Sequence, residues 1–441
     1  MLNIDAAPTD SISRIDSLLS QQPERSRCIL VLSSYSRSLT NFRLELLKSM
    51  VRAGHTVVAA GPEDDPEVRA DLAKIGVEFA CVPMARASLS PVRDVATFLH
   101  IRRLIKRIRP DVIVPYTMKP ILYGGIAARL AGVPCRCFLV TGLGHVFSEA
   151  NLKSLRGRWL KRLSVWLYRW AMAGAKVVFV YNDADRLDII ENALIRDVSI
   201  IHRVDGSGVD VDHYAFAPAP SEKPVFLMVA RLIKDKGVFE YVEAARRLKQ
   251  QRPNAEFQLL GPFDPNPAAI SLAQIQKWVG EGIIDYLGET KDVRPFLARC
   301  NIFVLPSYYR EGIPRSALEA MAVGRAIITT DLAGCSDTVE PGVNGYLVIP
   351  RSCDSLFSAM SALACRLQLA AELGRRSREL ACARFDVRLI NEILMHRMGL
   401  SNHDRSDEAL APDACEGPVQ EQAYTMRQQL DATRRVISWR G

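Results

Sequence analysis

The sequence predicts an α/β protein of two doubly wound domains, each a parallel sheet covered by helices on both faces, with a ligand cleft between them. Short unbroken runs of Val, Ile and Leu alternate with helical patterns along most of the 441 residues, as is typical of parallel sheets buried on both faces. The alternation is interrupted once, by the proline-rich stretch 215–224, and then resumes. In such domains ligands bind at the carboxyl ends of the strands.

The first domain is expected over 27–205, after a polar leader at 1–26. Its first strand is the apolar run 28–33, and the helical pattern from Phe42 to Val51 stops at Gly54. Further strands are expected at 56–60, 77–82, 111–116, 136–140, 176–181 and 199–202, and further helices at 66–75, 93–108, 120–131, 156–173 and 183–193.

A linker at 206–224 leads to a second domain over 225–384. Its strands are expected at 225–230, 257–260, 283–287, 302–305, 326–329 and 346–349, and its helices at 237–250, 267–279, 291–299, 315–323 and 354–382. A helix at 385–400 is expected to cross back to the first domain, and 401–441 forms a polar tail.

The positive charge of the chain is concentrated in one region. The net charge is +8, yet the segment 97–176 alone carries 15 Lys and Arg against only Asp111 and Glu149, a net +13. Such a patch suits nucleic acid, an anionic membrane or phosphate-bearing substrate, or solvent alone. Nucleic acid fits worst, because no recognised binding module accompanies the charge.

Part of this charge lies on a helix expected at 152–170. Apolar residues that include Trp159, Trp166 and Trp170 recur there at helical spacing, flanked by Lys and Arg. Tryptophans on a cationic helix suit the interface of an anionic membrane. The alternative is that this face packs onto its own sheet.

The cysteines favour neither disulfides nor a zinc site. The ten cysteines include no C-x-x-C pair, and the seven histidines show no metal-ligand spacing. Cys135 and Cys137, in a predicted strand, are expected to point to opposite faces. There is also no signal peptide and no apolar run near the roughly 18 residues that span a bilayer. A soluble or peripheral protein in a reducing compartment follows.

Two common nucleotide sites are disfavoured. The turn after the first strand, 33–41, holds no glycine, and the pattern G-x-x-x-x-G-K-[ST] is absent. A dinucleotide-binding G-x-G-x-x-G turn and a phosphate-binding P-loop therefore do not apply.

An anion site is instead predicted after the strand that ends at Leu305. The loop carries Glu311 and Gly312, and Pro314 stands where a first helical residue should. The free N–H groups of Arg315, Ser316 and Ala317 would then point into the cleft and bind phosphate.

Charged residues surround this predicted site. Glu319 has the reach for hydroxyls beside a bound diphosphate, and Glu311 lies on the opposite side. Arg231 and Lys236, at another strand-to-helix turn, are placed to neutralise a diphosphate leaving group. A nucleoside-diphosphate sugar matches these groups.

Four segments resemble glycosyltransferase family 4, the retaining enzymes of GT-B fold, in which two Rossmann-like domains face each other. They are E-G-I-P-R-S-A-L-E-A-M-A-V-G at 311–324, G-V-N-G-Y-L-V at 342–348, V-A-R-L-I-K-D-K-G at 229–237 and G-S-G-V-D at 206–210. The resemblance covers about 27–395.

The resemblance implies roles for single residues. Arg231, Lys236 and Glu311 would be catalytic, the two cations at the diphosphate and Glu311 at the donor sugar. Glu319 would bind the ribose, and Leu287 and Gly288 the base. The remaining donor-binding residues implied are Gly208, Gly312, Ile313, Pro314, Arg315 and Ser316. Because GT-B enzymes use basic side chains in place of a metal, the linker sequence Asp210-Val-Asp212 is interpreted as structural, and no metal or other cofactor is expected.

The segments 41–48, 116–124 and 140–147 resemble bacterial enzymes that extend undecaprenyl-diphosphate-linked glycans. The residues implied in acceptor binding are Arg43, Lys119, Thr141, Gly142 and His145. The alternative for Lys119 is a solvated side chain without a ligand. Many relatives carry a histidine near the end of this strand, and either His145 or Thr141 occupies that position here.

The resemblance thus implies a glycosyltransferase on the cytoplasmic face of the membrane. It would move a hexose or N-acetylhexosamine from a nucleoside-diphosphate sugar, with UDP favoured and GDP-mannose open, to a lipid-diphosphate-linked saccharide in surface polysaccharide synthesis. A sugar-nucleotide 2-epimerase of the same fold and a non-catalytic scaffold are the alternatives.

Overall fold

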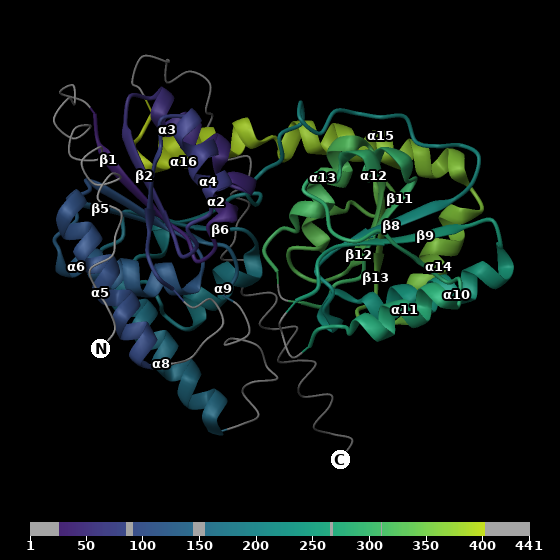
Figure 1. Cartoon of the computed structure of the whole chain (residues 1–441), viewed down its shortest axis with the longest axis horizontal. Coiled ribbons are helices and arrows are strands. Elements are labelled where there is room, and N and C mark those ends of the chain that lie inside the picture. The colour runs from purple at the N-terminus through teal and green to yellow at the C-terminus, as the bar shows by residue number, and fades with distance from the viewer. Residues whose placement is uncertain (1–25, 85–90, 144–154, 265–267, 310, 402–441) are drawn as a thin grey trace. The chain divides into compact units, whose positions relative to one another are not determined.

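The structure, a computed structural model, describes residues 26–84, 91–143, 155–264, 268–309 and 311–401 (Figure 1). It contains the two doubly wound parallel sheets that the sequence predicts.

The first sheet has seven parallel strands in the order β3-β2-β1-β4-β5-β6-β7. They are β1 (Cys28–Leu32), β2 (Thr56–Gly61), β3 (Glu78–Cys81), β4 (Val112–Pro115), β5 (Cys135–Val140), β6 (Val177–Val180) and β7 (Ile201–Arg203). Alternate residues of β1 join different hydrophobic clusters, Ile29 and Val31 on one face and Leu30 and Leu32 on the other. Both faces are buried, which is why the strand is apolar throughout.

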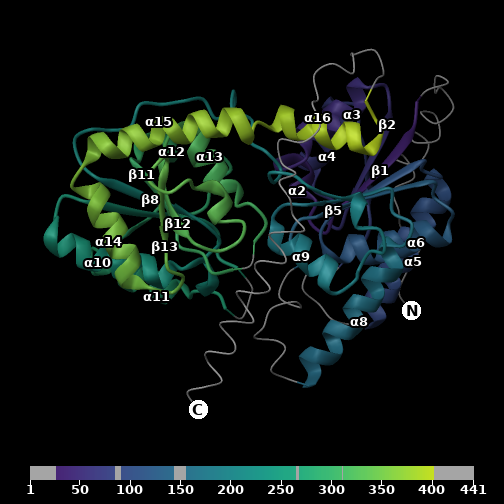
Figure 2. The ribbon, with the colours of Figure 1, turned by 180° about the vertical axis from the view of Figure 1, so that it is seen from behind.

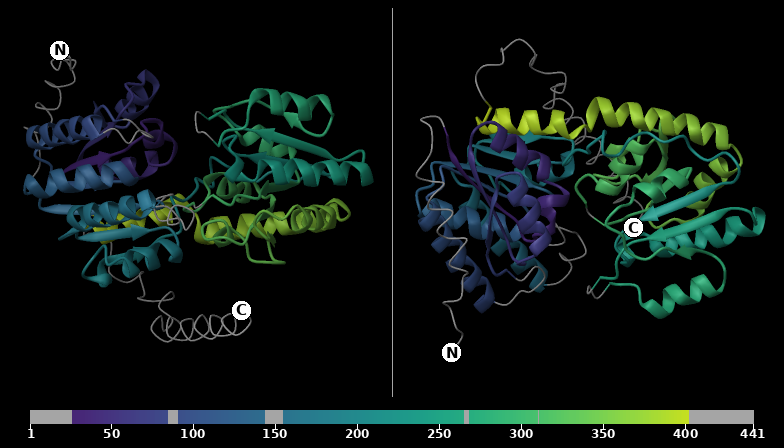
Figure 3. Two further views of the ribbon diagram at one scale, coloured as in Figure 1. Left: turned by 90° about the horizontal axis from the view of Figure 1, so that it is seen from below. Right: turned by 45° about the horizontal axis from the view of Figure 1, so that its top comes forward.

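Helices cover both faces of this sheet (Figure 3). They are α2 (Arg37–Asn41), α3 (Leu44–Arg52), α4 (Pro66–Lys74), α5 (Pro91–Ile108), α6 (Gly125–Leu130), α8 (Leu155–Met172) and α9 (Asp183–Glu191), with a π-helical turn at Pro120–Gly124 and a 3₁₀ turn at Val198–Ile200. The predicted helix at 120–131 therefore begins as a π-helix.

The second sheet has six parallel strands in the order β10-β9-β8-β11-β12-β13. They are β8 (Val225–Val229), β9 (Glu256–Leu260), β10 (Asp285–Tyr286), β11 (Ile302–Leu305), β12 (Ala326–Thr330) and β13 (Gly345–Val348). The central strands β8 and β11 end at the turns that carry Arg231 and Glu311, so the sheet brings these two turns to one edge.

The helices of the second sheet are α10 (Val238–Gln251), α11 (Leu272–Gly280), α12 (Arg294–Arg299), α13 (Arg315–Val323), α14 (Cys353–Ala364) and α15 (Leu367–Arg384), with 3₁₀ turns at Lys234–Lys236 and Ser336–Thr338. The expectation of one helix over 354–382 is wrong. Arg366 leaves the helical region with φ −139° and ψ 72°, and α14 and α15 are bent by 103°. The break lets α14 pack on α10 while α15 packs on α13 and β12.

The last helix, α16 (Val387–Met398), packs against α3 of the first sheet (Figures 1 and 2). Three basic side chains cover its carboxyl end. Lys176 donates to the carbonyl of Met398, Arg27 to that of Gly399, and a ring nitrogen of His55 lies 3.0 Å from the carbonyl of Leu400. The positive charges of Lys176 and Arg27 are stabilised by the negative end of the helix dipole.

No single helix in the described ranges is both long and apolar enough to cross a bilayer, although the bent pair α14–α15 meets the criteria of length and composition.

Candidate functional site

A buried ion pair joins the two turns at the edge of the second sheet. Lys236 Nζ lies 2.6 Å from Glu311 Oε2, and their side chains are only 11% and 13% exposed. Ser307, directly after β11, donates to Glu311 Oε1 at 2.6 Å. The 3₁₀ turn at Lys234–Lys236 ends at Gly237, whose φ of 79° suits a residue without a side chain. The sequence predicted both charged residues but not their pairing, nor Ser307.

The helix start that was predicted as the anion site is α13, with two corrections. Pro314 is not helical but caps the helix in an extended conformation (φ −67°, ψ 118°). The N–H of Ala317 is not free, because it donates to the carbonyl of Pro314 at 3.1 Å. The first two N–H groups, of Arg315 and Ser316, have no intrahelical acceptor by helix geometry. These two groups are the ones that remain for an anion.

Glu319 lies one turn into α13, where two side chains hold the same carboxylate oxygen. The hydroxyl of Tyr214 donates to Oε1 at 2.9 Å, and Arg315 Nε lies 3.1 Å from it. Burial raises the pKa of Glu319, against the opposing effects of Arg315 and Tyr214. Both bonds engage Oε1, so Oε2 takes part in neither of them.

Arg231 is held by a carboxylate that the sequence analysis did not single out. Its Nη1 lies 2.7 Å from Asp264 Oδ2, and Asp264 is 14% exposed. Both predicted diphosphate cations lie near the Tyr309 ring, whose centroid is 5.9 Å from Arg231 Cζ and 5.6 Å from Lys236 Nζ. Arg231 and Lys236 are thus brought together around one aromatic ring.

The predicted base-binding segment lies at the end of β10. The N–H of Leu287 donates to Leu259, and the carbonyl of Gly288 accepts from the N–H of Gly261 at 2.8 Å. The hydroxyl of Tyr286 donates to the carbonyl of Gly261. These bonds fix the ends of β9 and β10 side by side.

Two glycines of the G-S-G segment, the predicted Gly208 and Gly206, differ in surroundings. A Cβ on Gly208 would lie 2.6 Å from Val387 Cα, so its neighbour is the start of α16. It is Gly206 that faces the loop at 311–314, called the donor loop below because the resemblance implies donor binding there, since a Cβ on Gly206 would lie 3.0 Å from Ile313 Cβ. Gly206 is not among the residues that the sequence predicts for the site, although it stands in the same G-S-G pattern.

The loop of Glu311 and Gly312 also contacts segments that follow strands of the first sheet. Asn182 Nδ2 donates to the carbonyl of Glu311 at 3.2 Å. A Cβ on Gly312 would lie 2.8 Å from Tyr181 Cδ2 and 3.1 Å from the carbonyl oxygen of Thr141. Thr141 and Gly142, predicted at the acceptor, are therefore next to the donor loop. His145 lies outside the described residues.

The two predicted acceptor cations have different surroundings. Lys119 Nζ lies 2.7 Å from Asp94 of α5, and the two side chains are 12% and 19% exposed. Arg43 is 3% exposed and stacks on Tyr116 and Tyr181. The structure does not bring Lys119 and Arg43 into one ion-pair network among the described residues.

Cys135 and Cys137 point to the same face of β5, contrary to expectation. Their sulfurs lie 3.6 Å apart, because residues two apart in a strand share a face. The hydrogen bond from Cys137 lowers the pKa of Cys135 to about 7, against burial and with help from Lys176, Arg27 and Arg136. In the linker, Asp210 Oδ1 accepts from the N–H groups of Asp212 and His213, as in a turn.

The buried face of the basic helix α8 does not include Trp159 or Trp166. Tyr168, Ala171 and Met172 are buried, whereas Trp159 and Trp166 are 65% and 57% exposed. The alternative that the tryptophan face packs onto its own sheet therefore does not hold for these two residues. The predicted part at 152–154 lies outside the described residues.

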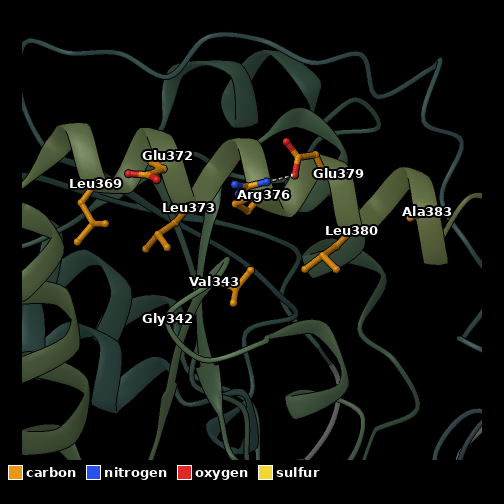
Figure 4. A pocket seen from close by; sticks show the side chains of 9 residues that line it. All are labelled: Gly342, Val343, Leu369, Glu372, Leu373, Arg376, Glu379, Leu380 and Ala383. Atoms are coloured by element: carbon orange, nitrogen blue, oxygen red, sulfur yellow. Dashed lines mark hydrogen bonds and ion pairs between the residues drawn. The ribbon is translucent and has the colours of Figure 1, made fainter.

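A pocket of about 510 Å³ lies elsewhere, between α15 and the loop at Gly342–Val343 (Figure 4). Leu369, Leu373 and Leu380 line it together with Arg376. None of the predicted site residues lines this pocket.

Two family models match the chain. Residues 223–366 match the model described as glycosyl transferases group 1, and residues 40–202 match that described as a glycosyl transferase 4-like domain. The matches cover most of the second and the first sheet, respectively.

Curated relatives extend over both sheets. The chain is 29% identical over 347 residues to an N,N'-diacetylbacillosaminyl-diphospho-undecaprenol alpha-1,3-N-acetylgalactosaminyltransferase of Campylobacter jejuni, covering 75% of this chain and 88% of that protein. It is 26% identical over 294 residues to a UDP-Gal:alpha-D-GlcNAc-diphosphoundecaprenol alpha-1,3-galactosyltransferase of Escherichia coli, covering 63% of this chain and 73% of that one.

Solved structures share the fold. Anabaena HepE in complex with UDP and glucose aligns with a TM-score of 0.66 and 18% identity, over 85% of this chain and 99% of that one. Sucrose-phosphate synthase of Thermosynechococcus elongatus aligns with a TM-score of 0.67 and 18% identity, over 84% and 98%.

Proposed function

Because the chain belongs to the family-4 glycosyltransferases of GT-B fold, we propose that it is a retaining enzyme that transfers a hexose or N-acetylhexosamine from a nucleoside-diphosphate sugar to a polyprenyl-diphosphate-linked saccharide. The observation that carries the donor assignment is the Lys236–Glu311 pair at the start of α13. It combines a cation, a carboxylate and free helix N–H groups, which suit a diphosphate joined to a sugar.

In this proposal the leaving diphosphate is stabilised by Lys236, Arg231 and the N–H groups of Arg315 and Ser316. The acceptor hydroxyl attacks the anomeric carbon as the bond to the diphosphate oxygen breaks. That oxygen takes the hydroxyl proton on the same face, so no separate base is needed. Charge on the diphosphate grows in the transition state, which is where fixed cations lower the barrier.

The donor base and the acceptor class rest on the relatives. UDP is favoured because the Escherichia coli relative is named for a UDP-sugar, and HepE was solved with UDP. Both curated relatives are named for diphosphoundecaprenol-linked acceptors. Surface polysaccharide synthesis at the cytoplasmic face of the membrane is the setting that fits such an acceptor.

We also propose that the enzyme contacts an anionic membrane through α8. The exposed Trp159 and Trp166 lie among Arg158, Arg162 and Arg169, which are exposed as well. Aromatic side chains at the interface with cations toward the headgroups are the pattern of a helix lying on a bilayer.

The transfer activity is tested with purified protein, UDP-sugars and GDP-sugars, and a polyprenyl-diphosphate-linked saccharide. A thermal-shift screen of the donors comes first, since a bound donor raises the stability of the folded state. We expect a lipid-linked product of retained configuration that forms in the presence of EDTA. An epimerised donor without acceptor would instead identify an epimerase. Full activity in all three variants Arg231→Ala, Lys236→Ala and Glu311→Ala would refute the site.

A further inference from the structure

Arg43 is a buried cation that faces no carboxylate in the described parts of the chain. Arg43 is only 3% exposed, and its Nε is buried without a hydrogen bond. Its Nη2 donates to the hydroxyl of Tyr181. The guanidinium lies over two rings, 5.1 Å from the centroid of Tyr116 and 5.7 Å from that of Tyr181.

The groups around Arg43 do not supply a negative charge. The hydroxyl of Tyr116 is 2.8 Å from Ser38 Oγ, which is 2.7 Å from Ser33 Oγ. Burial raises the pKa of Tyr116, more than Arg43 lowers it, so this phenol stays protonated at neutral pH. Two aromatic faces compensate a buried cation only in part, and a buried charge without a counterion is costly. An anion is therefore the ligand that this cluster lacks.

The position of the cluster suits a substrate. Tyr116 directly follows β4 and Tyr181 directly follows β6, so both lie at the carboxyl edge of the first sheet, where doubly wound folds bind ligands. Tyr181 also lies against Gly312 of the donor loop, since a Cβ on Gly312 would be 2.8 Å from its ring. An anion at Arg43 would thus sit beside the donor sugar, on the acceptor side.

Lys119, the other cation expected at the acceptor, is already neutralised. Its Nζ lies 2.7 Å from Asp94 in a pair that is largely shielded from solvent. A phosphate would have to displace or share this carboxylate, whereas at Arg43 it would supply a missing charge.

We propose that Arg43, and not Lys119, binds a phosphate oxyanion of the lipid-linked acceptor. This inference rests on the proposed function, because it takes the acceptor to be a diphosphate. The same chemistry would accept a phosphate of the donor, so the experiment separates these two sources.

Binding is measured by calorimetry on the full chain saturated with UDP, with farnesyl diphosphate in detergent as the probe and farnesol as the uncharged control. We expect Arg43→Met to weaken farnesyl diphosphate about tenfold or more, as loss of a charge-assisted bond implies. Its affinities for farnesol and for UDP should stay within twofold of wild type. Lys119→Met is the matched control and should change the affinity for farnesyl diphosphate less than threefold.

Three results would overturn the inference. The first two are an unchanged affinity of Arg43→Met for farnesyl diphosphate and a loss of this affinity in Lys119→Met as large as that in Arg43→Met. The third is an equal loss of UDP affinity in Arg43→Met, which would place the donor phosphate at Arg43. If Arg43→Met does not fold, Arg43→Lys replaces it, because lysine keeps the charge but not the planar fork. That variant should bind farnesyl diphosphate at least threefold more weakly than wild type with UDP unaffected. A wild-type protein that binds neither UDP nor another nucleotide would refute the proposed function instead.

Discussion

Lys236 Nζ and Glu311 Oε2 lie 2.6 Å apart at the edge of the second sheet, in a pair shielded from solvent. Each residue follows a different strand, so the pair also ties the β8 turn to the loop after β11. Removing one partner leaves the other charge buried without a counterion and lowers the free energy of unfolding strongly. Removing both partners lowers it much less.

We therefore predict that Lys236→Met lowers the free energy of unfolding by about 3 kcal/mol and abolishes measurable transfer. The double variant Lys236→Met/Glu311→Gln should regain most of the stability but no activity. Urea unfolding and transfer assays on the same samples measure both. A double variant as unstable as the sum of the single variants would show that the two residues are not coupled.

The Tyr214–Glu319 hydrogen bond leads to a second prediction. Tyr214→Phe leaves a buried carboxylate oxygen with one partner fewer, so we expect the donor KM to rise about tenfold, with kcat changed less. Tyr241→Phe is the control, because the Tyr241 hydroxyl donates to the core carbonyls of Phe226 and Gln258. It should lower stability and leave the donor KM unchanged. A similar KM in wild type and Tyr214→Phe would contradict a positioning role.

The raised pKa of Glu319 gives nucleotide binding a pH dependence. Burial shifts the pKa of this carboxyl above its ordinary value of 4.5, so on acidification it takes up a proton earlier than an exposed glutamate. The protonated form accepts hydroxyls less well, and UDP affinity should fall as the pH drops toward the raised pKa. In Glu319→Gln the affinity should be lower and flat over this range. Calorimetry across pH distinguishes the two profiles.

The raised pKa of Glu319 also makes the free energy of unfolding depend on pH, in the direction opposite to its effect on UDP affinity. A folded-state pKa raised above the unfolded one means that the folded protein holds its proton more tightly. The shift therefore stabilises the folded protein at pH values below the pKa of the unfolded state. This stabilisation is lost as the pH rises through the pKa of the folded state. Glu319→Gln should remove this component, which denaturant unfolding of both proteins at several pH values would reveal.

Cys135 should be the most reactive of the thiols at neutral pH among those described. The hydrogen bond from Cys137 lowers its pKa to about 7, and the thiolate is the nucleophile. Iodoacetamide labelling followed by site-resolved mass spectrometry should give a half-maximal rate near pH 7 for Cys135. Cys81, whose pKa is raised by burial, is the internal comparison and should need a higher pH. Cys137→Ala should move the profile of Cys135 upward.

Membrane contact through α8 is tested by flotation with liposomes containing phosphatidylglycerol. Trp159→Ala/Trp166→Ala should reduce the floated fraction several-fold at low salt, because both side chains are exposed and available to the bilayer. Leu272→Ala is the control. It removes a 54% exposed apolar side chain from α11, a helix that packs with the second sheet. A wild-type protein that stays at the bottom at every salt concentration would exclude this contact.

The order of the elements along the chain could be read from the sequence, because the pattern of apolar residues in each strand or helix is a local property. Runs such as Cys28–Leu32 and Ile302–Leu305 are buried along their whole length, so each strand is apolar without alternation. The sequence did not predict the break at Arg366, because the residues on both sides of it favour a helix. The chain bends there because α14 and α15 pack on different neighbours.

The sequence by itself also determined that a strand, a glycine loop, a proline and a helix follow one another at 302–323, and it is this order that predicts an anion site there. Only the tertiary structure decided which partner each charge has. Tyr214 and Glu319 are 105 residues apart, Arg43 and Tyr181 are 138 apart, and Arg231 and Asp264 are 33 apart. Such pairs depend on strand order and on crossovers, and no local propensity encodes them. For the same reason two cations that looked equivalent, Lys119 and Arg43, became a neutralised pair and a buried charge without a counterion.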